Sequence, residues 1–502
     1  MIDPLPRSRI VPIPSPLPPA WIRVAPTHPD PQERIGTSLY RVGPDRAFRT
    51  ALIDSIDNAH EVILIASFLL SDEELANAMV RAAKRGRRVY VLTASETRLD
   101  TTVDKADEFT ARMVEEHKRL LNRLVDHVVL RSAGHFHAKM LVCDPGTAPV
   151  GWVSTANFNR ALLDSVEIGF KVSEQAAVEL AAWFNWAFWM EAEHELVEKG
   201  RMPNVGQPPA EPLRPQPGTI VATARDETSL SDEVVRLIKS AQHRLVVSSY
   251  GLDANHAAIA AIRERLSLGV PVTIITRPRP AVTDAVQHLY YAGATIRAHD
   301  KLHAKAIIAD ETGILMTANI QAHGLDKGFE VGVRLQGEDA AALADTLDTW
   351  ATSFPWQFAA NLNRSEHKGE ICLAELGLRT GRRKVLKEKT VVLGTVTANS
   401  ALDLQSAPEP DLPLPKEEEH LYQRVRYEWQ VVPPRLPKGA KEIKRELTEG
   451  VFSGNGQKRM KAAYDPPAFS HEGETLVLLT KPEKTADAQR LAKKLNARVV
   501  IR

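Results

Sequence analysis

The stretch His137-Ala-Lys139-Met-Leu-Val-Cys-Asp144 returns later in the chain as His303-Ala-Lys305-Ala-Ile-Ile-Ala-Asp310. The His, the Lys and the Asp keep the same spacing in both places, and apolar residues precede each Asp. Two copies with matched internal order indicate a duplicated unit. Because a duplicated fold brings its equivalent strands together about a pseudo-twofold axis, the sequence predicts one site shared by the two copies.

Further polar residues follow each copy in a fixed order. They are Thr155, Asn157 and Glu167 after the first copy, and Thr317, Asn319 and Glu330 after the second. Apolar and β-branched neighbours predict that each motif lies in a short buried strand, where the His and the Lys share one face. Each Asp is expected at the end of its strand, where the sequence turns, and a following strand is expected to return each Asn to the start of the motif.

The predicted pocket contains two imidazoles, two lysines and two carboxamides, flanked by carboxylates. Such a set suits a tetrahedral anion, because Lys and Asn side chains donate hydrogen bonds to phosphoryl oxygens. One His can attack phosphorus while the other protonates the leaving oxygen. A carboxylate on the far ring nitrogen would fix the orientation of an imidazole. The expected chemistry is therefore phosphodiester transfer.

The paired motifs resemble the two signature motifs of the phospholipase D superfamily, His-x-Lys-x4-Asp followed by Gly-Ser-x-Asn, over residues 40–360. The resemblance implies a covalent phosphohistidine, no metal or other cofactor, and one active site faced by both motifs. The implied catalytic set is His137, Lys139, Asp144, Asn157, His303, Lys305, Asp310 and Asn319, supported by Thr155, Glu167, Thr317 and Glu330. His137 is expected to be the nucleophile and His303 the acid, although the reverse assignment stays open.

The sequence departs from the family pattern in two places. The Gly-Ser pair is Ser154-Thr155 in the first copy and Met316-Thr317 in the second. The hydroxyl is kept in both copies. The missing glycines are expected to tighten the pocket, and Met316 is expected to alter the space left for a substrate.

Other interpretations of the motifs fit the pattern less well. A lone His on an apolar strand usually belongs to a core, but two separate cores would not share the same polar residues in the same order. A catalytically inactive relative is disfavoured, since no His, Lys or Asn of either motif is lost. His135, two residues before His137, is expected to line the wall of the pocket rather than bind a metal ion.

Length and composition are those of a multidomain globular protein. The 502 residues predict about three domains, and 43% of the residues are hydrophobic and 25% charged. The pattern predicts an α/β fold with two tandem phospholipase D-like α/β/α sandwich halves and a small C-terminal α+β domain. The expected segments are a proline-rich arm (1–40), the first half (41–202), a linker (203–218), the second half (219–365) and a basic C-terminal domain (366–502).

The two halves show the same order of predicted elements. The first has strands at 62–67, 88–93 and 128–131, with helices at 72–84 and 103–125. The second has strands at 244–249, 272–276 and 295–298, with helices at 257–268 and 282–292. Strands are also expected at 389–397 and 425–431, and a β-α-β unit at 475–501. Tryptophans near the end of each half are expected to pack in the core: Trp183, Trp186, Trp189, Trp350 and Trp356.

The charge of the chain is balanced overall but unevenly placed. It has 64 basic and 63 acidic residues, of which 26 basic and 19 acidic ones lie in residues 361–502. Cys143 and Cys372 are too few for a disulfide framework. With no evident secretory signal or membrane span, a cytoplasmic protein with no membrane partner is expected.

These features favour a nuclease whose partner is DNA or RNA. The candidate phosphate-binding residues in the basic region are Arg382, Arg383, Lys384, Arg424 and Arg426. Tyr427 and Trp429 fit a core better than base stacking. Protein partners would bind through the C-terminal domain. Two alternatives stay open: a phospholipid phosphodiesterase or phosphatidyltransferase similar to cardiolipin synthase, and a non-catalytic adaptor in a nucleic-acid-processing complex.

Overall fold

The structure is a computed structural model that describes most of the two halves and part of the C-terminal region. The described residues are 18–25, 34–35, 38–42, 46–95, 108–208, 210–360, 371–375, 423–428, 475–480 and 485–501. They belong to two units, a larger one of Pro18–Leu362 with Lys368–Glu388 and a smaller one that holds the C-terminal elements. Arg382, Arg383, Lys384, Trp429 and the expected strand at 389–397 lie outside the described residues.

A nine-stranded mixed sheet forms the first half, in the order β10-β6-β5-β4-β7-β8-β9-β3-β2. In chain order its strands are β2 (Arg34–Ile35), β3 (Leu39–Arg41), β4 (Val62–Ser67), β5 (Arg88–Ala94), β6 (Val129–Ala133), β7 (Met140–Cys143), β8 (Val150–Ser154), β9 (Ile168–Val172) and β10 (His194–Leu196). The helices are α1 (Ala47–Asn58), α2 (Glu73–Lys84), α4 (Glu108–Leu124), α5 (Ala161–Asp164) and α6 (Glu174–Met190). Strands β4, β5 and β6 are parallel, whereas β7, β8 and β9 continue the sheet in antiparallel fashion.

The second half repeats this arrangement in a ten-stranded sheet, β11-β17-β16-β15-β12-β13-β14-β18-β1-β19. Its strands are β1 (Ala20–Arg23), β11 (Ile220–Thr223), β12 (Leu245–Ser248), β13 (Val272–Thr276), β14 (Thr295–Ala298), β15 (Ala306–Ala309), β16 (Thr312–Met316), β17 (Glu330–Leu335), β18 (Trp356–Ala359) and β19 (Ile371–Leu373). The helices are α7 (Ser229–Ser240), α8 (Ala257–Ser267), α9 (Thr283–Tyr291) and α10 (Gly337–Ser353). The order β14-β13-β12-β15-β16-β17 matches β6-β5-β4-β7-β8-β9 in order and direction, which confirms the predicted duplication.

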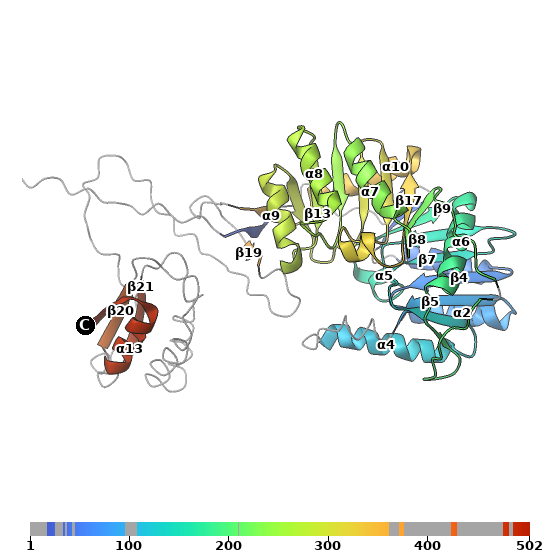
Figure 1. Cartoon of the computed structure of the whole chain (residues 1–502), viewed down its shortest axis with the longest axis horizontal. Coiled ribbons are helices and arrows are strands. Elements are labelled where there is room, and N and C mark those ends of the chain that lie inside the picture. Colours follow the sequence, from blue (N-terminus) through green and yellow to red (C-terminus); the bar gives the residue numbers. More distant parts are fainter. Residues whose placement is uncertain are drawn as a thin grey trace, which may run out of the picture. The chain divides into compact units, whose positions relative to one another are not determined.

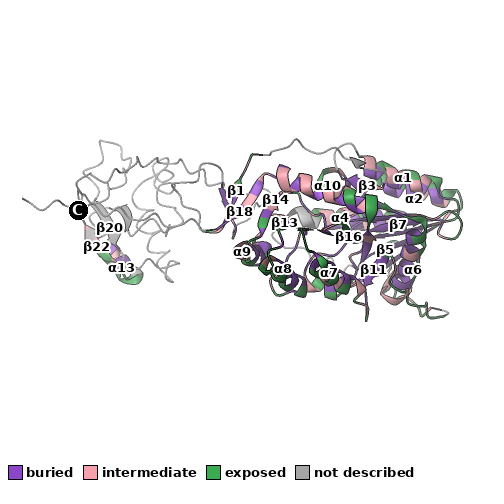
Figure 2. Cartoon of the chain, turned by 90° about the horizontal axis from the view of Figure 1, so that it is seen from above, coloured by how far each residue is buried: buried purple, intermediate pink, exposed green. Residues whose placement is uncertain are grey.

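The two sheets lie side by side (Figure 1). One hydrophobic core contains residues of both halves. Side chains alternate between the two faces of a strand. Ile308 of β15 therefore lies in the shared core, while its neighbour Ile307 lies in an outer core that also contains residues of α7, α8 and α9. The shared core also contains α6 and α10, and Trp183, Trp186 and Trp350 are buried there as expected. Figure 2 shows buried positions gathered on the strands and on the helix sides that face them.

Residues from the start of the chain belong to the second sheet. Strand β1 lies between β18 and β19, with Ala20 opposite Ala359 on one side and Leu373 on the other. Trp21 is fully buried, and its ring meets that of Phe358 edge-on at 5.2 Å between centroids. Part of the expected proline-rich arm is thus an interior strand of the second half, and residues 371–373 complete the same sheet.

The smaller unit contains a three-stranded sheet and one helix among its described residues. These are β20 (Gln423–Glu428), β21 (Thr475–Thr480), α13 (Thr485–Leu495) and β22 (Arg498–Ile501). The segments match the expected strand, helix and strand at 475–501, but β20 lies between β21 and β22 and is antiparallel to both. The expected β-α-β unit is therefore split by a strand that holds Arg424, Arg426 and Tyr427. In the parts of the chain that the structure describes, no helix is long and apolar enough to cross a membrane.

Candidate active site

The two motifs meet where the halves touch, through matching backbone hydrogen bonds. The amides of His137 and Ala138 donate to the carbonyl of Phe329 at 3.0 and 3.1 Å. The amides of His303 and Ala304 donate to the carbonyl of Val166 at the same two distances. Each motif is thereby held against the residue that precedes the Glu of the other half.

The expected strand placement of the motif residues needs a correction. His137 and Lys139 lie in the extended segment before β7, and His303 and Lys305 lie before β15, so none of the four is inside a strand. The Lys still turns back to its His, as expected. At the start of each motif the backbone forms an isolated bridge to the opposite half and does not pair with a strand of its own sheet. The strand begins only after the Lys.

Each histidine is paired with a glutamate from the other half. Nδ1 of His137 lies 2.8 Å from Oε1 of Glu330, and Nδ1 of His303 lies 2.6 Å from Oε1 of Glu167. A neutral imidazole that donates its Nδ1 proton to a carboxylate keeps Nε2 free as a base or nucleophile. The site is therefore reciprocal, since each half supplies a His and the carboxylate that orients the other His.

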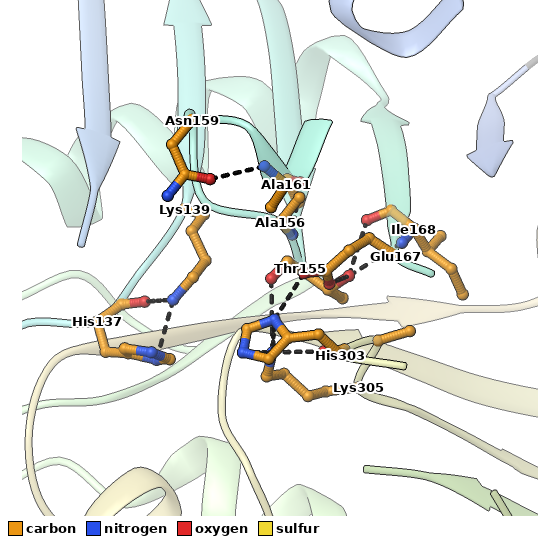
Figure 3. A network of polar contacts seen from close by, with 12 residues as sticks. His137, Lys139, Thr155, Ala156, Asn159, Ala161, Glu167, Ile168, His303 and Lys305 are labelled. Atoms are coloured by element: carbon orange, nitrogen blue, oxygen red, sulfur yellow. Dashed lines mark hydrogen bonds and ion pairs between the residues drawn. The ribbon is translucent and has the colours of Figure 1, made fainter. Parts of the chain in front are cut away.

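A threonine holds each of these glutamates in place. Thr155 Oγ1 donates to Glu167 Oε2 at 2.5 Å, and Thr317 Oγ1 donates to the equivalent oxygen of Glu330. Figure 3 shows Thr155 and Glu167 reaching His303 from the opposite half. The hydroxyls kept in both copies of the sequence thus bind the glutamate carboxylates, which in turn bind the imidazoles.

The two lysines are enclosed beside their histidines. Nζ of Lys139 lies 3.0 Å from Nδ1 of His137, and Nζ of Lys305 lies 2.9 Å from Nδ1 of His303. Each ammonium also donates to the backbone carbonyl of its own His. Burial lowers the pKa of Lys139 to about 7 and that of Lys305 to about 8, although Glu330 and Glu167 respectively oppose the effect. Each buried carboxylate thus stabilises the charged form of a buried lysine, and each lysine stabilises the charged form of a carboxylate.

Few side chains of this set reach solvent. The imidazoles of His137 and His303 are 28% and 20% exposed, whereas Lys139 and Lys305 are fully buried. Asn157 and Asn319 are half-buried, and their amide oxygens accept no hydrogen bond from any described residue. The side chains of this set with exposed surface are therefore the two imidazoles and the two carboxamides, and carboxamide nitrogens are donors that suit phosphoryl oxygens.

The two aspartates of the motifs have a different environment. Asp144 accepts hydrogen bonds from the amides of His60, Glu61 and Val62 at 2.7, 2.8 and 3.0 Å. Asp310 does the same for the amides of residues 242–244 at 2.8 to 2.9 Å. Both aspartates lie just after a strand with a left-handed backbone (φ 48° and 52°), so the expected position at a strand end is confirmed. The structure does not bring their carboxylates to the histidines.

We expect Asp144→Ala to affect stability rather than chemistry. Burial alone would raise the pKa of Asp144, but the three amide donors outweigh it and hold the pKa below its usual range. Losing this acceptor should cost about 1–3 kcal/mol, measured by chemical denaturation. At low temperature, kcat per folded molecule should stay within about twofold of wild type. The control is Asp126→Ala on an exposed turn, and a large loss of kcat with unchanged stability would assign Asp144 to the chemistry instead.

The two residues that stand in place of the glycines of the family pattern are both buried. Ser154 is buried, and its Oγ accepts from the amide of Ala156 at 3.0 Å. Met316 is buried in the outer core of the second half, among residues such as Ile307 and Ile314. Since its side chain points away from the shared core, Met316 does not shape the space beside the histidines as the sequence suggested.

Two aromatic residues beside the histidines were not identified from the sequence. Phe68 lies 5.0 Å from the His137 ring, and Tyr250 lies 4.6 Å from the His303 ring, between centroids. Each follows a serine, Ser67 or Ser249, whose Oγ accepts from the amide of the residue after the motif Asn. A signal was present in the repeated Ser-aromatic pair at the end of β4 and directly after β12.

His135 lies at the edge of the site. Its backbone carbonyl accepts from the amide of Phe329, and its ring is 6.5 Å from that of His323. Among the residues that the structure describes, no group of three or more His, Cys, Asp or Glu side chains has the arrangement of a metal site. The placement of His135 fits a wall residue.

The depressed pKa values of the two histidines lead to a pH dependence. Burial lowers the pKa of both His137 and His303 to about 4, against the opposing effect of their glutamates. The productive form needs one neutral and one protonated imidazole, so the pair must hold one proton. We expect kcat/KM to be highest on the acidic side of 6.5, the ordinary histidine value, and to fall as the pH rises and the acid loses its proton.

This expectation is checked by pH–rate profiles with two kinds of leaving group. A p-nitrophenolate leaves without a proton, so the fall at high pH should flatten with bis-p-nitrophenyl phosphate and persist with a dinucleotide. A maximum at alkaline pH with both substrates would contradict the assigned roles.

Comparison with known proteins agrees with this geometry. The family model described as "Cardiolipin synthase, PLD-like domain" matches residues 52–189 and 234–351, which together make up half of the chain. The chain belongs to this family, within the phospholipase D superfamily. Its two halves are tandem phospholipase D-like units, and its activity is of the phosphodiesterase or transferase type.

Three solved structures that match the chain are distant from it in sequence. Phosphatidylserine synthase from Haemophilus influenzae Rd KW20 is 13% identical, covers 68% of this chain and 89% of its own, and has a TM-score of 0.48. Polyphosphate kinase from Porphyromonas gingivalis is 14% identical over 64% of this chain and 50% of its own, with a TM-score of 0.43. Nuc from Salmonella typhimurium is 18% identical over 27% and 95%, with a TM-score of 0.25. No curated protein matches the sequence.

Proposed function

We propose that this protein is a metal-independent nuclease that cleaves DNA or RNA phosphodiesters through a phosphohistidine on His137. The observation that carries the chemistry is the reciprocal pairing of each His with a Glu of the opposite half. It provides two oriented imidazoles at one place, as a double displacement at phosphorus requires. The lysines beside them supply positive charge, and the carboxamides of the motifs supply hydrogen-bond donors for the transition state.

The proposed reaction has two steps. In the first, Nε2 of His137 forms a bond to phosphorus while the bond to the leaving oxygen breaks, and His303 gives its proton to that oxygen. In the second, water attacks the phosphohistidine, His303 takes a proton from the water, and the bond between phosphorus and Nε2 breaks. Glu330 stabilises the charge on the imidazole of His137 in the intermediate, and Glu167 does so for His303 when it is protonated.

The residues around His303 favour a polynucleotide as the substrate. Tyr250 contacts the His303 ring, and the guanidinium carbons of Arg279 and Arg277 lie 4.0 and 5.6 Å from the Tyr250 ring centroid. Aromatic side chains with adjacent arginines are typical of surfaces that bind single-stranded nucleic acids. The basic C-terminal region, with Arg424 and Arg426 on β20, would add non-specific attraction to phosphates and would be the place for protein partners.

The apolar surroundings of His137 favour a phospholipid substrate as the second candidate. Phe68, Leu69, Ala94 and Val114 form a small apolar cluster on that side, and the description of the family model also points to lipids. The same two-histidine chemistry would then act on a lipid headgroup ester, by hydrolysis or transfer.

One experiment separates these candidates. Wild type and His137→Ala are incubated in EDTA with single- and double-stranded DNA, RNA and phospholipid vesicles, and the reaction is stopped with alkali because phosphohistidine is acid-labile. We expect wild type to cleave a nucleic acid and the variant to be inactive. Headgroup release without cleavage of nucleic acid would establish the lipid alternative. A dependence on divalent metal would overturn the phosphohistidine route, and intact cellular function of His137→Ala would indicate a non-catalytic adaptor.

A further inference from the structure

The two sides of the site are equivalent in fold but opposite in character. Thr93 and Thr276 are equivalent positions near the ends of β5 and β13. The Oγ1 of each donates to a backbone carbonyl just after the neighbouring strand, that of Phe68 at 3.2 Å and that of Ser249 at 2.8 Å. The next residue is Ala94 in the first half and Arg277 in the second. Ala94 is buried in the apolar cluster around Phe68, whereas Arg277 is half-buried beside Tyr250.

Arg277 and Arg279 place two positive charges near the ring of Tyr250. The guanidinium of Arg279 stacks over Tyr250, and no described carboxylate lies within ion-pair distance of either arginine. Burial, together with the charge of Arg277, lowers the pKa of Arg279, although Tyr250 opposes the effect. Two partly buried cations held together without an anion form a site that an anionic ligand would neutralise.

The position of this pair relative to the reaction follows from in-line displacement. The nucleophile and the leaving oxygen lie on opposite sides of phosphorus, and the acid stands next to the leaving oxygen. With His137 as the nucleophile and His303 as the acid, the leaving fragment extends towards Tyr250 and the arginines. The fragment that stays on the phosphohistidine extends towards the apolar cluster.

We propose that Arg277 and Arg279 bind a second phosphate carried by the leaving fragment, the phosphate adjacent to the scissile one in a polynucleotide. This proposal rests on the proposed nuclease function and adds a direction to it. Two planar guanidiniums suit phosphate oxygens, and Tyr250 holds one of them in place by its ring face. The site would thereby accept an unsymmetrical diester in one orientation.

Dinucleotides with and without a terminal phosphate test this proposal. The substrates are dTpdT, the same dinucleotide with a 5′-phosphate, and the same dinucleotide with a 3′-phosphate. We expect one of the two phosphorylated forms to be cleaved with a kcat/KM about tenfold above that of dTpdT, because it adds charge-assisted hydrogen bonds. Product analysis should show the extra phosphate on the fragment that is released without the scissile phosphate.

The double variant R277Q/R279Q should abolish this advantage. Its loss of kcat/KM for the phosphorylated dinucleotide should exceed any loss for dTpdT or bis-p-nitrophenyl phosphate by about tenfold, since neither of these two substrates carries a second phosphate. R279K, which keeps the charge, should restore part of the advantage. The control is Arg263→Gln on the exposed face of α8, which removes one positive charge away from the site. Equal cleavage of both phosphorylated forms, or an equal loss on all substrates in the double variant, would overturn the proposal.

An inhibition experiment keeps the subsite testable if the nuclease function itself fails. Thymidine 3′,5′-bisphosphate is added as a competitor of bis-p-nitrophenyl phosphate hydrolysis, a reaction that needs only the two-histidine site. We expect its Ki to rise about tenfold in R277Q/R279Q and to lose most of its dependence on salt. An unchanged Ki would refute the subsite, whereas a raised Ki with no cleavage of any dinucleotide would leave the subsite in place and refute the nuclease function.

Discussion

Replacing His137 with Ala is expected to lower kcat for phosphodiester cleavage by at least about 10⁴-fold, the scale seen when a covalent nucleophile is removed. His303 cannot replace His137 as the nucleophile, because its Nε2 is required on the opposite side of phosphorus to protonate the leaving oxygen. The fold should persist, because the imidazole is 28% exposed and the backbone of residue 137 keeps its hydrogen bond to Phe329. Thermal unfolding monitored alongside kcat checks both expectations.

The comparison with His303→Ala decides which histidine is the nucleophile. Loss of a general acid should cost about 10²–10⁴-fold on a dinucleotide. It should cost much less on bis-p-nitrophenyl phosphate, whose leaving group needs no proton. His137→Ala should stay inactive on both substrates. If His137→Ala were rescued by the good leaving group and His303→Ala were not, the two roles would be reversed.

Exchange of the orienting carboxylates is expected to have the second-largest effect. Glu330→Gln should lower kcat by about 10²–10⁴-fold, the range found when the group behind a catalytic histidine loses its charge. The amide keeps the shape and can still accept from Nδ1, but it no longer stabilises a positively charged imidazole. Because Glu330 raises the pKa of His137 against the dominant effect of burial, the variant should also move the acidic limb of the kcat/KM profile to lower pH.

Several controls test whether Glu330 acts by positioning and charge. Glu115→Gln removes a carboxylate from the exposed face of α4 and should leave the profile unchanged. Glu167→Gln should reproduce the loss of kcat through His303 of the second half. If Glu330→Gln lowered kcat without shifting the pH profile of kcat/KM, Glu330 would have only a role in packing.

The two copies of the motif show which features of the fold can be predicted from the sequence. The repeated spacing of His, Lys and Asp predicted the duplication, and the structure confirms it in the matching strand orders. The strands around residues 62–67 and 272–276 were located because short apolar runs between turns carry a strong local signal. These features depend on neighbours in the chain, so they are visible in one sequence.

Other features of the site depend on contacts between distant residues. His303 and Glu167 are 136 positions apart, and nothing in their local patterns indicates that each glutamate serves the opposite half. The spacing placed Asp144 at a strand end, but only the three-dimensional fold shows that its carboxylate holds backbone amides there. Arg277 and Arg279 follow an ordinary strand, and their proximity to His303 arises from the packing of the second sheet.

The position of β1 has a consequence for the order in which the protein is made. Residues 20–23 leave the ribosome before the first half does, but their partner strand β18 (Trp356–Ala359) follows most of the second half. Since domains fold from the N-terminus during synthesis, the first half can assemble while β1 still has no sheet to join. The sheet of the second half is complete only when β18 pairs with β1, which was made before the first half, and β19 can then add to the outer side of β1. Deleting residues 20–23 should therefore leave the nascent first half intact and expose an open sheet edge on the finished protein, which is a site for aggregation.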